Sequence, residues 1–235
     1  MITGLHFRND AKQIMRDTIM TLMMFAPLLL TVVVKLMVIY LVPFIASKTG
    51  IDASQYYQYV LASTMIINAS MMGIVIGFMM IDERDSSITQ LMAVTPLGRS
   101  GYLINRLSLI VITTLFYNIF AHIILGIVQI PMLSVLHLVV LSAIYSAIVG
   151  LLLYLGAEDK VKGLTFAKGL NVMILFIFSD LFSLKWLTAI SWIFPTYWFS
   201  GALKTPTSIF TNVMAFLVSS IWLGVLIYRF WKRET

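Results

Sequence analysis

The sequence predicts an all-α membrane protein that crosses the bilayer six times. Of its 235 residues, 60% are hydrophobic and 11% are charged, whereas soluble globular domains are about half apolar and about a quarter charged. A hydrocarbon core about 30 Å thick takes roughly 20 apolar residues per helical span. The long apolar stretches therefore fit six spans, and residues 1–235 are interpreted as a single transmembrane domain without a soluble catalytic domain.

The first span follows a basic segment that we expect to form an amphipathic helix. The apolar run after it continues to about Phe44, well beyond the 7 to 15 residues of a signal-peptide core, so an uncleaved span is expected. The other spans follow with short connections. The six spans are predicted at residues 19–43, 59–81, 103–128, 133–156, 170–194 and 208–228.

Positive charge is concentrated on one side of this layout. The opposite side receives only Lys48, Lys185 and Lys204, and Lys35 falls inside the first span. Cytoplasmic connections of membrane proteins carry an excess of Lys and Arg, so this asymmetry predicts that both termini are cytoplasmic. The basic residues on the predicted cytoplasmic side are Arg8, Lys12, Arg16, Arg84, Arg99, Arg106, Lys160, Lys162, Lys168, Arg229, Lys232 and Arg233.

Small residues form two ridges at helical spacing. One ridge lies in the second span and the other in the fourth. Such ridges let helices approach closely where lipid provides no hydrophobic drive, either within one chain or between subunits. The ridges are Ala69, Gly73 and Gly77, and Ser142, Ser146 and Gly150.

The connection between the second and third spans is the most informative segment. Ser87 and Gln90 fit a capping box, and the apolar residues after Ser87 recur at helical spacing until Pro96 stops the helix. The predicted helix has about two turns and is roughly 10 Å long, which is too short to cross a membrane. This short helix is either an interfacial connection or a projection that another protein grips.

The same segment resembles the coupling-helix region of ABC-2 type permeases, the membrane subunits of bacterial ABC exporters. In that family an acid-base-acid start leads to a leucine-rich short helix, a Thr-Pro pair and a tyrosine-led third span. The basic start, the six spans and a break at 194–198 near the outer end of the fifth span extend the resemblance over the chain. One departure is Ser86-Ser87, where the family often has Gly. The residues that carry the motif are Glu83, Arg84, Asp85, Leu91, Thr95, Pro96, Leu97 and Tyr102.

The resemblance implies a multi-pass permease of the bacterial cell membrane that performs no ATP chemistry itself. The chain contains no GxxxxGK[ST] loop to hold ATP phosphates, so ATP and Mg²⁺ would bind to a separate ABC ATPase, present in two copies. A second permease chain, identical or homologous, and membrane lipid complete the implied partners, without nucleic acid. The implied ATPase-coupling residues are Glu83, Arg84, Asp85, Leu91, Met92, Thr95 and Pro96.

Two charges, Lys35 and Asp180, are expected deep inside the predicted spans, away from their ends. Lys35 and Asp180 are expected at comparable depth, which leaves three interpretations: an ion pair, a snorkelling lysine without a role, or a charge that faces cargo. His122 and Asn118 share a helix face, but too few ligands converge there for a metal site. We therefore expect neither a metal nor a cofactor on this chain.

Two other functional classes compete with the exporter permease. An ion- or proton-coupled carrier normally has paired acids in several spans, and an intramembrane enzyme needs converging acids and histidines. The sequence shows neither pattern. The expected cargo is apolar or amphipathic, because small ABC-2 permeases resemble exporters of drugs and of amphipathic peptides such as phenol-soluble modulins. Lipid and polysaccharide cargoes stay open at this point.

Overall fold

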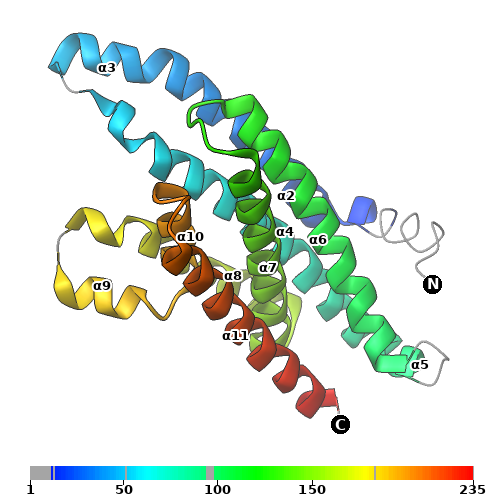
Figure 1. Cartoon of the computed structure of the whole chain (residues 1–235). Coiled ribbons are helices and arrows are strands. Elements are labelled where there is room, and N and C mark those ends of the chain that lie inside the picture. The colour runs from blue at the N-terminus through cyan, green and yellow to red at the C-terminus, as the bar shows by residue number, and fades with distance from the viewer. Residues whose placement is uncertain (1–11, 13, 51, 94–97, 183, 235) are drawn as a thin grey trace.

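The computed structural model describes residues 12, 14–50, 52–93, 98–182 and 184–234, and every regular element in these ranges is helical (Figure 1). Within these ranges, six helices are long and apolar enough to cross a membrane, which agrees with the predicted number of spans. The predicted N-terminal amphipathic helix falls mostly on residues 1–11 and 13, outside the described residues. The candidate spans are Thr18–Thr49, Ala53–Asp85, Gly98–Leu125, Met132–Gly156, Lys160–Phe182 and Ile209–Arg233.

Two helices form the centre of the bundle. The most apolar windows of α4 (Tyr57–Asp85) and α7 (Met132–Gly156) are 89% and 78% buried, whereas that of the first span is 6% buried. The two predicted small-residue ridges face each other here. A Cβ atom on Gly73 would lie 2.6 Å from the carbonyl oxygen of Ser146. The ridges therefore serve packing within the chain.

The first span is long and lies at the edge of the bundle. It starts at Asp17, whose carboxylate accepts hydrogen bonds from the N–H groups of Ile19 and Met20 at 2.9 and 3.0 Å. It ends where Gly50 adopts a left-handed φ of 70°. Aliphatic and aromatic side chains cover its surface, as expected for a helix that faces lipid or a partner. It consists of α2 (Thr18–Leu36), the π-helical turn η1 (Met37–Leu41) and α3 (Val42–Thr49), and the 3₁₀ turn η2 (Ala53–Tyr56) precedes α4.

The fifth span differs from the predicted range 170–194. It runs from Lys160 to Phe182 as α8 (Lys160–Leu170) and the 3₁₀ helix η3 (Asn171–Phe182). The chain then turns back, and α9 (Lys185–Ser191) runs alongside η3 as a hairpin (Figure 1). Hydropathy misplaced the span because the returning helix is also apolar.

A break follows α9, as the Phe194-Pro195 pair predicts. The carbonyl groups freed at the break are satisfied by two indole N–H groups: Trp198 donates to Trp192, and Trp222 donates to Ile193, each at 2.8 Å. Unpaired carbonyls would be costly in lipid, so the tryptophans stabilise this break. The chain continues through α10 (Pro195–Lys204) into α11 (Ile209–Glu234).

Candidate functional site

The segment with the coupling-like motif lies at one end of the bundle. There α4 ends, the short helix α5 (Ile88–Ala93) follows, and α6 (Gly98–Leu125) begins. The starts of α2 and α8 and the end of α11 lie at this same end, which we call the α5 end (Figure 1).

A buried ion pair closes the base of this segment. Arg106 on α6 donates from Nη2 to Oε1 of Glu83 at 2.5 Å and from Nε to Oε2 at 3.0 Å. The hydroxyl of Tyr102 donates to Oε2 of Glu83 at 2.8 Å. Glu83 is 1% exposed and Arg106 is 4% exposed. A bidentate Arg–carboxylate pair fixes distance and orientation together, so it locks the end of α4 to α6.

Arg84 holds the adjacent end of α7. Its guanidinium donates to the carbonyl oxygens of Tyr154, Ala157 and Glu158 at 3.2, 3.1 and 2.6 Å. Arg233 of α11 donates to the same Tyr154 oxygen at 3.1 Å. The last carbonyls of a helix have no partner within it and carry partial negative charge, so cations bind there favourably.

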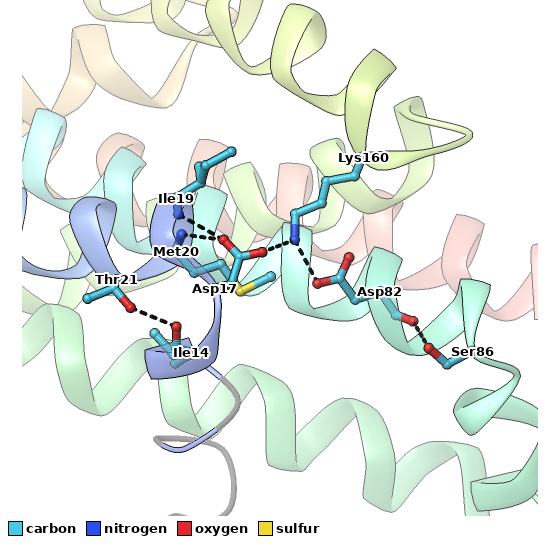
Figure 2. Close-up of polar contacts among 8 residues, drawn as sticks. All are labelled: Ile14, Asp17, Ile19, Met20, Thr21, Asp82, Ser86 and Lys160. Carbon is cyan, nitrogen blue, oxygen red and sulfur yellow. Dashed lines mark hydrogen bonds and ion pairs between the residues drawn. The ribbon is translucent and has the colours of Figure 1, made fainter.

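A third charge cluster joins elements that are distant in sequence. The ammonium group of Lys160, at the start of α8, contacts the carboxylate of Asp17 and lies 2.9 Å from that of Asp82 near the end of α4 (Figure 2). Asp17 precedes α2. The cluster therefore ties the starts of the first and fifth spans to the second span.

Helix α5 itself projects from this anchored base. Leu91 is 64% exposed, and the Asp85 side chain at the end of α4 is 47% exposed. Met92, in contrast, packs partly against the core. Ser87 takes a left-handed φ of 59°, so the chain turns sharply between α4 and α5 where the resembling family often has Gly. The predicted coupling residues Thr95 and Pro96 lie outside the described residues.

Comparison with known proteins places this fold in a family. The family model described as "Fluoroquinolones export permease protein Rv2686c-like" matches residues 10–231. The chain belongs to this export permease family. The fluoroquinolones export permease proteins Rv2686c and MT2760 of two Mycobacterium tuberculosis strains, H37Rv and CDC 1551, are each 27% identical to it over 202 residues. The match covers 83% of this chain and 79% of each relative. No solved structure matches the chain.

Two of the predicted coupling residues have a different place in this permease than the sequence indicated. Glu83 was predicted to contact another protein, but its carboxylate is buried against Arg106 and Tyr102. The guanidinium of Arg84 is similarly occupied by the end of α7. The reason is that α4 continues as a packed helix to Asp85. Among the seven candidates, Leu91 and Asp85 are the exposed ones in the described residues.

The ion pair of Lys35 and Asp180, one of the three interpretations that the sequence leaves open, is absent from the described residues of the permease. Lys35 donates to the carbonyl oxygen of Leu125 at the end of α6, at 2.6 Å. Asp180 instead accepts from Lys204 of α10 at 2.7 Å. The fifth span begins earlier than predicted, so Asp180 lies near its end beside α10, where Lys204 is the nearer cation.

Polar residues inside the bundle serve packing between helices. Asn118 donates to Ser142 of α7 at 2.7 Å and to the carbonyl oxygen of Met65 at 3.1 Å. Within the described residues, no group of three or more His, Cys, Asp or Glu side chains could hold a metal ion.

Sequence reasoning missed the connecting role of Asp17, Asp82, Lys160 and Arg233. All four were visible as charges near span ends on one predicted side of the membrane. The opposite signs of the acids and Lys160 were the available signal, but pairing them requires knowing which spans are neighbours. That information resides in the packing of the permease and not in local sequence.

Proposed function

We propose that the chain is the membrane-spanning permease subunit of an ABC exporter, driven by a separate ATPase. The family match over residues 10–231 carries this proposal. Two permease chains, identical or homologous, would assemble with two ATPase subunits. The α5 end would face the cytoplasm, as the distribution of basic residues favours.

In this proposal α5 is the element that the ATPase grips. The exposed Leu91 supplies an apolar contact, and Asp85 beside it supplies a charge. The ion pair of Glu83 and Arg106 supports this role, because a force applied to α5 then reaches α4 and α6 as a unit. Closure of the ATPase pair on ATP would shift this unit and bias the permeases toward outward release.

We propose aromatic, amphipathic drug-like compounds as the cargo. Both M. tuberculosis relatives are named for fluoroquinolones, which combine a planar aromatic ring system with a carboxylate and a basic amine. The chain is 13% aromatic and contains 15 methionines. Flexible thioether side chains repack around varied apolar ligands, which suits such cargo.

The test is reconstitution of the complete transporter. The tagged chain is purified from membranes of its own cells, and the copurifying protein with a P-loop motif is identified. The complex is then placed in liposomes with the ATPase sites outside. We expect ATP-dependent accumulation of ciprofloxacin, followed by its fluorescence, and loss of accumulation when the P-loop lysine of the ATPase is replaced by alanine.

Two results would overturn the proposal. One is accumulation by the purified chain without any ATPase. The other is accumulation that follows an imposed proton gradient and ignores ATP, which would place the chain among ion-coupled carriers. ATP-dependent transport of a different compound would contradict the cargo alone.

A further inference from the structure

Three elements that are far apart in sequence meet at one ammonium group. Lys160 opens α8, Asp17 precedes α2, and Asp82 lies one turn before the end of α4. Figure 2 shows the Lys160 side chain reaching between the two carboxylates. The contacts span 143 and 78 residues of sequence. The three elements are not neighbours in the chain, so the cluster adds a direct polar link between helices that otherwise meet through side-chain packing.

Asp17 is built into the helix start as well as into the cluster. One carboxylate oxygen accepts from the N–H groups of Ile19 and Met20, and the other accepts from Lys160. Burial raises the pKa of Asp17, but Lys160 and the two N–H donors outweigh it, so the pKa is lowered from its usual value. The carboxylate is therefore ionised at neutral pH, and a displacement of Lys160 acts directly on the first turn of α2.

Asp82 connects the cluster to the coupling segment. It directly precedes Glu83, and its carbonyl oxygen accepts from the N–H and hydroxyl of Ser86 at 3.0 and 2.7 Å. Ser86 is the last residue before the left-handed turn at Ser87 that leads into α5. Asp82 thus moves with the base of α5.

The cluster is partly shielded from water. The side chains of Lys160, Asp17 and Asp82 are 25%, 27% and 33% exposed. Fully exposed ion pairs contribute little because water screens them. Lys162, two residues further along α8, provides a contrast: it pairs with Glu158, four residues earlier, and both side chains are more than half exposed.

The two spans that Lys160 holds are packed thinly elsewhere. The most apolar windows of the first and fifth spans are 6% and 28% buried, against 89% for the second span. Spans with few buried contacts shift more readily than a packed centre. The ion pairs of Lys160, near the starts of the first and fifth spans, therefore contribute strongly to the position of these spans relative to α4.

We propose that Lys160 is a positioning residue of the coupling step, which carries a displacement of α5 to the starts of the first and fifth spans together. This inference rests on the proposed function. It assigns Lys160 no contact with cargo or nucleotide. Its effect is exerted through Asp17 and Asp82.

The first experiment measures the link without transport. The chain has no cysteine, so spin labels can be placed at the exposed positions Thr18 and Ser86, and in a second sample at Ser86 and Val161. Pulsed electron paramagnetic resonance on the purified chain in lipid nanodiscs then reports the two distances. We expect each labelled pair to give a single narrow distribution of distances in the chain with Lys160. In both samples Lys160→Gln should broaden this distribution, and Lys160→Arg should retain it.

The second experiment measures coupling in the reconstituted complex with its ATPase. We expect Lys160→Gln to lower cargo transported per ATP by about fivefold or more, the lower end of ordinary coupling factors. Lys162→Gln is the matched control and should leave the ratio unchanged. Exchanging the charges in the double variant Lys160→Asp with Asp82→Lys should restore part of the ratio, because the relocated ammonium group could then contact both Asp17 and the new carboxylate at position 160.

The outcomes separate the link from the proposed function. Narrow distances in Lys160→Gln, or equal losses in Lys160→Gln and Lys162→Gln, would overturn the inference even if the complex exports cargo normally. If the complex showed no ATP-driven transport, the proposed function would fail, and the distance measurements would still report on the link by themselves.

Discussion

Glu83 and Arg106 form a buried two-point ion pair that joins α4 to α6 beneath α5. The two residues are 23 positions apart, and the whole coupling segment lies between them. Because the pair closes the base of this segment, α5 moves with the ends of two spans and not as a loose loop. In the proposed function, the buried pair is what lets the short helix act as a lever on α4 and α6.

Removing one partner of this pair should destabilise the protein strongly. Glu83→Ala leaves the Arg106 guanidinium without its carboxylate, and breaking a buried pair costs about 3–5 kcal/mol of unfolding free energy. We expect a large fall in the thermal unfolding midpoint of the purified chain in detergent, measured by fluorescence.

The control for this prediction removes both charges. The double variant Glu83→Leu with Arg106→Leu replaces the pair by apolar groups and should recover most of the lost stability, since no charge is then left buried alone. An unfolding midpoint of Glu83→Ala equal to that of the unmodified chain would contradict the burial of this pair.

Leu91 is the exposed apolar residue through which we expect α5 to contact the ATPase. Leu91→Asp should leave stability within about 0.5 kcal/mol, as surface substitutions usually do, and yet abolish ATP-driven export. Met92 is less suitable because it is partly buried. The measurement is the amount of cargo transported per ATP hydrolysed in liposomes.

The matched control is Leu184→Asp, the same chemical change at a residue 42% exposed at the opposite end of the bundle. It should leave coupling intact. Normal coupling in Leu91→Asp would remove α5 from the ATPase contact.

Exchange of charges distinguishes Lys204, the observed partner of Asp180, from Lys35, a partner that the sequence left open. Asp180 contacts Lys204, and Lys35 contacts the end of α6. The double variant Asp180→Lys with Lys204→Asp should therefore express and fold better than either single variant. Asp180→Lys with Lys35→Asp should show no such recovery. Folded yield by size-exclusion chromatography is the readout, and recovery in the second double variant would favour a Lys35–Asp180 pair.

The sequence predicted the number of spans because each span is a local property. Roughly 20 consecutive apolar residues satisfy their own backbone hydrogen bonds and cross lipid regardless of their neighbours. The small-residue ridges that contain Gly73 and Ser146 could also be predicted, since helical spacing alone aligns small residues on one face, whereas their facing each other is seen only in the structure. The fifth span was misplaced because α9 after it also contains apolar residues, and hydropathy does not register a reversal of chain direction.

The charged residues were harder to place, for a different reason. Whether Glu83 faces solvent or Arg106 depends on how far α4 stays packed beyond its apolar core, which is set by α6 and α7. The partner of Asp180 likewise depends on the packing of α10 against η3, which brings Lys204 beside it. Local sequence shows that these charges lie near span ends, and only the packing of helices determines their partners.

Arg84 and Arg233 should show a stability coupling, because both donate to the same carbonyl oxygen of Tyr154. That oxygen has two lone pairs, so a single Arg→Met change leaves it one charged donor and also relieves the repulsion between two nearby cations. Loss of both donors leaves the end of α7 without its charged caps, and hydrogen bonds to charged groups contribute about 1.5–3 kcal/mol each. We therefore expect the double variant to lose more stability than the two single variants added together, as measured by the unfolding midpoints of the four proteins. Strictly additive losses would show that the two arginines stabilise α7 independently, and a double variant no worse than Arg84→Met would show that Arg233 has no part in holding the helix end.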